Sequence, residues 1–371
     1  MSGEIQAIVM PKWGLAMQEG TLLKWLVSEG DAIRPGQEIC DIETSKITNA
    51  LESTVSGTLV RRVVEEGTLL PVGALMGVVT EGAVDGAAID AFVARFEEAF
   101  AAAAKEQAAA GPSNRSVEVG GVAINYVAMG EGGEPVVFLH GFGGDLNSWM
   151  FNQPEIAAAR ATYALDLPGH GASAKRVADG SVAGLAGVVA GFLDALAIER
   201  AHLVGHSLGG AIALALALER PARVASLTLV AGAGLGPEIN IDYIQGFIAA
   251  GGRRDIKPKL EMLFADPSLV TRDMIDEVLK YKRLDGVDAA LKAIAAAAFA
   301  GGRQATVLRD RLGEVEVPVQ VVAGAQDRII PPAHAEGLPG NVAVHRLGNA
   351  GHMPHMEAAG DVNRLLAALP G

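Results

Sequence analysis

An internal repeat near the N-terminus constrains the fold of this chain more than any other feature. The segment GTLLKWLVSEGDAIRPG, which begins at Gly20, aligns without gaps with GTLVRRVVEEGTLLPVG, which begins at Gly57. The offset is 37 residues throughout, and seven positions are identical in the two copies. Each copy contains short strand-like runs separated by turn residues, and two such units bury their faces against each other. We therefore expect a small β-sandwich with quasi-two-fold symmetry that ends near Thr80.

The repeat and the motifs around it resemble a lipoyl domain over residues 4–80. The matching motifs are MPKWGL from Met10, EG from Glu19, EGD from Glu29, IETSK from Ile42 and SG from Ser56. In that family the lysine at the tip of a hairpin carries lipoate through an amide bond. The resemblance implies a small all-β sandwich over residues 1–80.

Lys46 lies between the two copies of the repeat, where the symmetry predicts a hairpin. The resemblance implies that Lys46 carries the lipoate and that a lipoate ligase attaches it. Biotin carriers have a similar fold but place a methionine on each side of their lysine, whereas Ser45 and Ile47 flank Lys46. The alternative is an ordinary surface lysine. We expect Cys40 to be a small buried hydrophobic residue rather than a redox thiol.

Residues 81–115 form an Ala-rich linker that is not simply flexible. Its large apolar residues are spaced i, i+3, i+4, i+7 and i+11, which is one face of an α-helix. They are Ile89, Phe92, Val93, Phe96 and Phe100. The spacing predicts an amphipathic helix over residues 88–110 that stops at the Gly-Pro pair at 111–112. We expect its apolar face to pack on a neighbouring domain; a dedicated partner-docking helix is the alternative.

Strand-like and helix-like runs alternate over residues 116–371, which is typical of a mostly parallel α/β sheet. The alternation is interrupted at about 236–313, where helix-like runs follow one another, and we expect these to form a cap over the carboxyl edge of the sheet. The expected cap helices are Asp242–Ala250, Lys257–Phe264, Arg272–Leu284 and Val287–Phe299. The expected strands are Ala123–Met129, Pro135–Leu139, Thr162–Leu165, His202–Val204, Ser226–Val230, Val319–Val322 and Val342–Arg346.

A GHSLG sequence centred on Ser207 lies between a strand-like run and an Ala- and Leu-rich helix-like run. A serine at such a strand-to-helix turn takes a strained backbone that presents its oxygen at the sheet edge. Asp327 follows the strand-like run VPVQVV, and His352 lies on a loop after the last strand. We expect His352 to deprotonate Ser207 and Asp327 to orient the imidazole. His355 is the alternative to His352, and Asp327 is alternatively an ordinary helix N-cap.

A glycine-rich turn, HGFGG from His140, follows the strand-like run PVVFL. The N–H of Phe142 can pair with the N–H of Leu208, the residue after the serine, as an oxyanion hole. We expect His140 itself to be structural and to bond the backbone of its loop. The role of His206, inside the serine motif, stays open.

Residues 117–371 resemble an α/β-hydrolase with a helical cap. The motifs that match this family are HGFGG, DLPGHG from Asp166, GHSLGG, Asp327 and Gly351-His352. Serine at position 207 argues against the dehalogenase and epoxide-hydrolase branches, whose nucleophile is an aspartate. The fold class is therefore multidomain: a lipoyl sandwich followed by an α/β-hydrolase domain at 116–371.

A lipoyl domain joined to an α/β-hydrolase resembles the acyltransferase (E2) component of acetoin-cleaving dehydrogenase complexes over nearly the whole chain. The resemblance implies three linked steps. A thiamine-diphosphate-dependent E1 cleaves acetoin and acetylates the lipoyl arm, this chain transfers the acetyl group to coenzyme A, and a flavin-dependent dihydrolipoyl dehydrogenase reoxidises the arm. The H-x-x-x-D-G motif of the usual E2 core is absent from the sequence, so the chemistry is left to the Ser-His-Asp residues.

Two other functions remain open. One is a lipoyl-linked serine esterase or thioesterase, in which water accepts the acyl group. The other is a non-catalytic lipoyl carrier or scaffold. A direct mechanism is a further alternative, in which His352 activates the coenzyme A thiol and Ser207 only stabilises the oxyanion.

Charge and composition disfavour several classes of partner. The chain has 43 acidic and 30 basic residues, a net charge of −13, which argues against nucleic acid and anionic membrane surfaces. Cys40 is the only cysteine, so an intramolecular disulfide and a multi-cysteine metal cluster are excluded, and we expect no metal site. The sequence starts without a basic segment followed by an apolar core and has no apolar run of about 20 residues. We expect a cytoplasmic protein that does not associate with a membrane.

Overall fold

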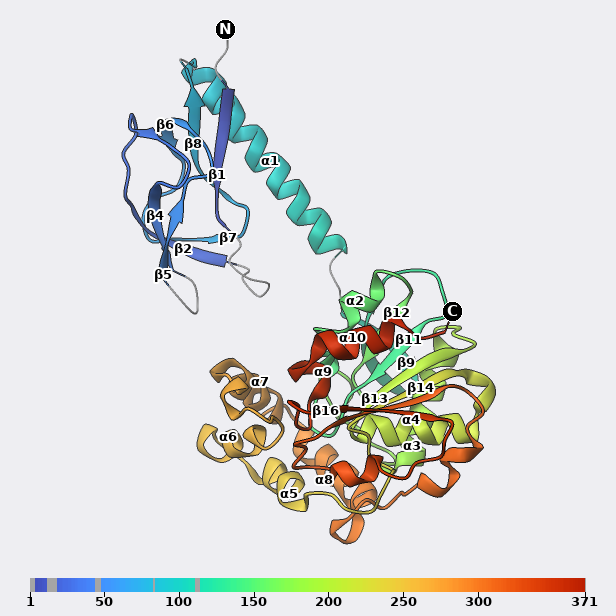
Figure 1. The fold of residues 1–371 in the computed structure, drawn as a ribbon. Coiled ribbons are helices and arrows are strands. Elements are labelled where there is room, and N and C mark those ends of the chain that lie inside the picture. Colours follow the sequence, from blue (N-terminus) through green and yellow to red (C-terminus); the bar gives the residue numbers. More distant parts are fainter. Residues whose placement is uncertain (1–3, 12–18, 44–47, 83, 111–113, 371) are drawn as a thin grey trace. The chain divides into compact units, whose positions relative to one another are not determined.

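The computed structural model describes residues 4–11, 19–43, 48–82, 84–110 and 114–370 (Figure 1). The chain divides into two compact units, Met1–Gly111 and Pro112–Gly371. Within the described ranges, no helix is long and apolar enough to cross a lipid bilayer.

The first unit contains two four-stranded antiparallel sheets. In spatial order, one consists of β1 (Glu4–Val9), β8 (Leu75–Glu81), β6 (Gly57–Arg62) and β3 (Ala32–Ile33). The other consists of β5 (Thr48–Glu52), β4 (Glu38–Glu43), β2 (Glu19–Trp25) and β7 (Thr68–Pro71). The sequence repeat relates β2 to β6, β3 to β7 and β4 to β8, and the members of each pair lie in opposite sheets. The predicted quasi-two-fold sandwich is confirmed.

The repeated residues occupy equivalent positions in the two halves. Leu22 and Leu59 are both fully buried between the sheets. Two of the three repeated glycine pairs have left-handed backbone in both copies, where a side chain would be strained. Their φ values are +94° at Gly30, +84° at Gly67, +79° at Gly36 and +85° at Gly73. The glycines recur at an offset of 37 because both halves make the same turns.

Lys46 lies outside the described residues. The strands before and after it are described: β4 ends at Glu43, β5 begins at Thr48, and these two residues pair with each other in antiparallel register. Asp41 and Ile42 pair with Ala50 and Asn49 in the same ladder. The chain therefore returns from β4 directly to its neighbouring strand.

Helix α1 (Gly86–Ala110) belongs to the first unit and runs beside β1 and β8 (Figure 1). The Asp85 side chain accepts a hydrogen bond from the N–H of Ala87, which stabilises the start of the helix. Ile89 is buried against Leu75 and Val78 of β8. Phe92, Val93 and Phe96 join this cluster, and Phe100 lies against Gly73 in the turn between β7 and β8. The stripe is thus covered by the β-sandwich.

The second unit is built on one eight-stranded sheet. Its spatial order is β16 (Val342–Leu347), β15 (Val319–Gly324), β14 (Val224–Val230), β13 (Ala201–His206), β11 (Val136–Leu139), β12 (Thr162–Leu165), β10 (Val122–Met129) and β9 (Asn114–Val119). The strands from β16 to β12 are parallel, and β10 and β9 are antiparallel. The sequence analysis predicted all of these strands except β9.

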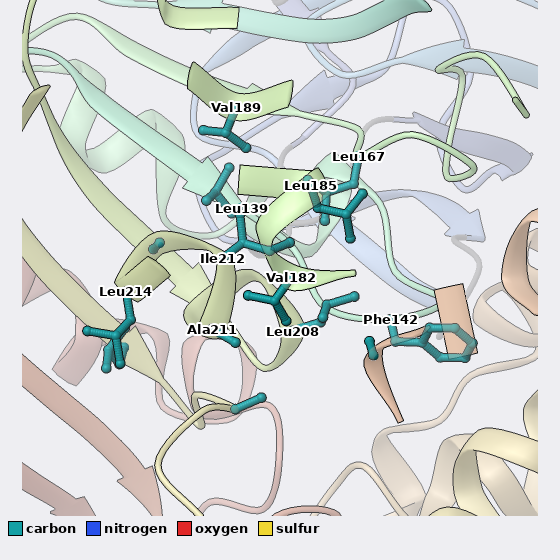
Figure 2. Close-up of a cluster of buried hydrophobic side chains, with 14 of the residues drawn as sticks. Leu139, Phe142, Leu167, Val182, Leu185, Val189, Leu208, Ala211, Ile212 and Leu214 are labelled. Carbon is teal, nitrogen blue, oxygen red and sulfur yellow. The ribbon is translucent and has the colours of Figure 1, made fainter. Parts of the chain in front are cut away.

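Successive side chains of each central strand point to opposite faces of the sheet, and each face is buried in its own hydrophobic core. Both sets of residues are therefore apolar, and the strands appear in the sequence as continuous apolar runs. Val137 and Leu139 of β11 face a cluster with α3 (Val182–Ala195) and α4 (Leu208–Glu219), shown in Figure 2. Val136 and Phe138 face a second cluster, to which α2 (Gln153–Ala157) and α10 (Ala359–Ala367) contribute.

Four helices between β14 and β15 form the cap. They are α5 (Ile241–Ala249), α6 (Arg253–Glu261), α7 (Arg272–Lys282) and α8 (Val287–Ala298). N-terminal side-chain hydrogen bonds stabilise the first turns of α5 and α7. The side chain of Asn240 accepts from the N–H of Tyr243, and that of Thr271 accepts from the N–H of Met274. All four lie within the predicted stretch at about 236–313.

Replacing Ile89 by Ala should destabilise the first unit by about 2 kcal/mol, because it removes buried methyl groups from the α1–β8 contact. Native-state hydrogen exchange of the β8 amides in the full chain measures this. Glu98 is exposed on the opposite face of α1, so Glu98→Ala is the matched control and should change stability by less than about 0.5 kcal/mol. Equal protection of β8 in both variants would contradict the packing.

Candidate active site

Ser207 joins β13 to α4 at a sharp turn, with φ +51° and ψ −118°. The two flanking glycines are required by close backbone approaches. A Cβ at Gly205 would lie 2.3 Å from the carbonyl oxygen of Gly209, and a Cβ at Gly209 would lie 2.4 Å from that of Leu139. The strained serine therefore presents its side chain where β13 ends.

His352 and Asp327 form a buried hydrogen-bonded pair. The His352 Nδ1 and the Asp327 Oδ2 are 2.8 Å apart, with side-chain exposures of 2% and 4%. The second carboxylate oxygen of Asp327 accepts from the N–H groups of Ile329 (2.7 Å) and Ile330 (3.0 Å). Asp327 therefore caps the backbone that follows it and also orients His352. Because Nδ1–H donates to Asp327, the Nε2 of His352 is left as the ring nitrogen that can accept a proton.

Ser207 and His352 line the same cavity, whose volume is about 870 Å³. The cap supplies much of its apolar wall, including Ile244, Phe247 and Leu260. Four methionines also line it: Met150, Met274, Met353 and Met356. Methionine side chains are flexible and polarizable, so this part of the wall can adapt its shape to a ligand.

The glycine-rich turn after β11 lies directly against the serine. A Cβ at Gly141 would lie 2.9 Å from the Cβ of Ser207. Among the described residues, the N–H groups of Phe142 and Leu208 have no protein acceptor, so both are available to an oxyanion. The ring of Phe142 packs edge-on against the cap residues Phe247 and Phe299, with centroids 6.1 and 5.7 Å away.

Two histidines brace this turn. His140 Nδ1–H donates to the carbonyl of Gly141 (2.8 Å), and its Nε2 accepts from the N–H of Leu167 (3.0 Å). The Nε2 of His170 accepts from the N–H of Gly143 (3.1 Å). The structural role predicted for His140 is confirmed, and the turn is fixed to the segment that follows β12.

His355 does not take the place of His352. It is fully buried, and its two ring nitrogens have no partner among the described residues. Its ring lies between those of Trp149 and His206, each with its centroid 4.5 Å away. Burial, followed by the nearby His352, lowers the pKa of His355 to about 3. Of the two histidines, His352 has the acidic partner.

The sequence analysis missed the contacts that hold the histidine loop. Glu357, at the end of α9 (Pro354–Glu357), accepts from the N–H groups of Gly351 (2.7 Å) and Ala265 (2.6 Å). The N–H of His352 donates to the carbonyl of Leu263 (2.7 Å). Leu263 and Ala265 follow α6 in the cap, so the cap and the histidine loop are joined. No local motif marks the two contacts with the cap, because Ala265 and Leu263 lie about 90 residues from their partners in sequence.

Comparison with known proteins gives two family matches. The model described as alpha/beta hydrolase fold matches residues 134–359, and the model described as biotin-requiring enzyme matches residues 6–79. A meta-cleavage product hydrolase from Pseudomonas fluorescens IP01 is similar in structure, with a TM-score of 0.63 and 24% identity over 69% of this chain and 96% of that one. The fold is thus an α/β-hydrolase preceded by a biotin/lipoyl domain.

Two curated relatives match nearly the whole chain. Both are named the dihydrolipoyllysine-residue acetyltransferase component of an acetoin cleaving system. The protein from Cupriavidus necator is 48% identical over 99% of this chain and 97% of its own length. The protein from Pseudomonas putida is 49% identical over 98% of each. This chain belongs to the family of these acetyltransferase components, and the resemblance drawn from its motifs is confirmed.

Replacing His355 by Phe should reduce the acid sensitivity of the second unit. Unfolded His355 takes up a proton near pH 6.5, whereas the buried side chain stays neutral until about pH 3. The unfolded state therefore binds more protons between these values, and the wild type loses stability as the pH falls. Between about pH 8 and pH 5 the variant should lose about 2 kcal/mol less. Urea unfolding across this pH range measures the difference, and equal losses would contradict it.

Proposed function

We propose that this chain transfers an acetyl group from a lipoyl arm to coenzyme A within an acetoin-cleaving system. The observation that carries the proposal is that Ser207 and the Asp327-bonded His352 line one cavity in a chain that also has a lipoyl domain. The names of the two full-length relatives support the same activity. The cavity volume, about 870 Å³, is in the range that holds small-molecule substrates.

Lipoate on Lys46 is the cofactor of this proposal, attached by a lipoate ligase. The antiparallel pairing of β4 with β5 on either side of Lys46 supports it. The other components would be a thiamine-diphosphate-dependent E1, which loads the arm, and a flavin-dependent dihydrolipoyl dehydrogenase, which reoxidises it. We place the protein in the cytoplasm, since its one cysteine, Cys40, is a buried free thiol.

In the first half-reaction Ser207 Oγ attacks the thioester carbonyl of the acetyl-dihydrolipoyl arm, and His352 Nε2 takes the serine proton. The N–H groups of Phe142 and Leu208 stabilise the oxyanion. When the tetrahedral intermediate collapses, the C–S bond breaks and His352 returns the proton to the dihydrolipoyl thiol. Acetyl-Ser207 remains.

In the second half-reaction His352 takes the proton of the coenzyme A thiol, and the sulfur attacks acetyl-Ser207. Collapse forms acetyl-coenzyme A, and His352 returns the proton to Ser207. No electron changes hands in either half. The strained Ser207 and the oriented His352 argue against a mere scaffold, because a docking domain requires neither.

The test measures acetyl-coenzyme A formed from acetyl-dihydrolipoamide and coenzyme A, with free acetate counted in the same reaction. Acetyl-coenzyme A in large excess over acetate supports the transferase. Acetate in excess supports the esterase or thioesterase, and the absence of both products supports the carrier or scaffold.

Ser207→Ala should lower the rate of acetyl transfer by at least about a thousandfold, because the residues of a triad act as one unit. Asp327→Asn should cost less, but well over tenfold, since it leaves the geometry and disturbs the histidine tautomer. Stopped-flow assays of coenzyme A acetylation measure both. A loss of only tenfold in Ser207→Ala would instead favour direct attack by the coenzyme A thiolate.

Intact-mass measurement should find one lipoyl group on chain made with lipoate and a ligase. Lys46→Ala should lose it, because no other lysine lies between the two paired strands. Lys24 lies on β2 and is exposed, so Lys24→Ala is the matched control and should keep the group. An adduct that persists in Lys46→Ala would place the carrier elsewhere.

A further inference from the structure

Among the described residues, the side chain of His206, the residue before the proposed nucleophile, makes one hydrogen bond, and its partner is the backbone of the proposed base. Its Nε2 lies 2.8 Å from the backbone carbonyl oxygen of His352. A carbonyl oxygen only accepts, so the Nε2 of His206 carries the hydrogen and donates it. The side chain is 4% exposed, so little water competes for this bond.

The ring of His206 is enclosed by three parts of the site. A Cβ at Gly141 would lie 2.9 Å from its Nδ1, so the oxyanion turn lies against one edge. The ring centroids of His352 and His355 are 4.8 and 4.5 Å away. Burial holds the pKa of His206 well below its ordinary value, and His355 and His352 lower this pKa further. The ring therefore stays neutral and keeps its hydrogen on Nε2.

This hydrogen bond connects two segments that the fold holds in different ways. Ser207 is fixed to the sheet, since its N–H donates to the carbonyl of Val230 (3.0 Å). The N–H of His352 donates to the carbonyl of Leu263 in the cap. Glu357 accepts from the N–H of Gly351 in the same loop and from the N–H of Ala265 in the cap. If this hydrogen bond to the serine segment were absent, a substrate that displaced the cap would also displace His352.

We propose that His206 is a positioning residue for acetyl transfer, which fixes the backbone of His352 at the distance from Ser207 that proton transfer requires. This inference rests on the proposed function, since it needs His352 to act as the base for Ser207. Asp327 sets the rotation of the imidazole, and His206 sets the place of the backbone that carries it. A displacement of about 1 Å is enough to cost a hundredfold in rate.

Two substitutions of equal length separate the hydrogen bond from the space that the ring fills. His206→Gln places an amide N–H donor at the distance of Nε2, whereas His206→Met has the same length and no donor. His206→Met should lower kcat about 30- to 100-fold with KM changed less than about twofold. His206→Gln should recover kcat to within about fivefold of wild type. Urea unfolding of both variants shows whether the second unit stays folded.

The rate at which a fluorophosphonate labels Ser207 gives a second readout, which depends on the base but on neither coenzyme A nor the lipoyl arm. It should fall in His206→Met and recover in His206→Gln. Equal kcat in the two variants, or a defect confined to KM, overturns the inference. A wild type that labels but forms no acetyl-coenzyme A refutes the transferase alone, and the labelling rates still decide the role of His206. A wild type that neither labels nor transfers overturns both.

Discussion

The active site depends on a steric constraint at the turn between β13 and α4. Ser207 has a backbone conformation that costs about 1–3 kcal/mol, and the fold offsets it with hydrogen bonds on both sides. The N–H of Ser207 donates to Val230 (3.0 Å), and its carbonyl accepts from Ala233 (2.9 Å). Gly205 and Gly209, two residues to either side of the serine, and Gly141 across from it have no space for a Cβ. The glycines are thus what allows Ser207 and the turn that carries Phe142 to approach each other.

The order of the strands brings the remaining parts to the same edge. β11 and β13 are parallel neighbours, so the turn that carries Phe142 lies beside the serine. β15 and β16 are also parallel neighbours, so the loops of Asp327 and His352 leave the sheet side by side. Groups at the carboxyl ends of parallel strands meet in one crevice. Four loops, each simple in sequence, therefore bring the proposed catalytic residues to one edge of the sheet.

The sequence was informative wherever a local rule determines the structure. The offset of 37 predicted the sandwich because identical turns need glycine at identical places, such as Gly36 and Gly73. The periodicity predicted α1 but could not say which surface covers Ile89 and Phe96, since helical spacing carries no information on the partner. β9 was missed because an edge strand such as Asn114–Val119, with mostly exposed side chains, lacks a strong apolar pattern. The contact of Glu357 with Ala265 and that of His206 with His352 were missed because each joins residues far apart in the sequence and leaves no motif.

In the proposed mechanism, acetyl transfer rather than hydrolysis requires that water be kept from the acyl-enzyme, and the structure connects the cap, which would do this, with the loops of His352 and Asp327. Leu263 and Phe264 line the cavity, and the same segment bonds the loops of the base and the acid. Leu263 accepts from the N–H of His352, and Phe264 accepts from the side chain of Arg328 (2.6 Å), next to Asp327. The same cap segment therefore contributes to the apolar wall, which offers water few hydrogen-bond partners, and to the position of His352. A cap displaced far enough to break the hydrogen bonds of Leu263 and Phe264 would also release the loops of His352 and Asp327, so in the proposed mechanism the cavity wall and the alignment of the base change together.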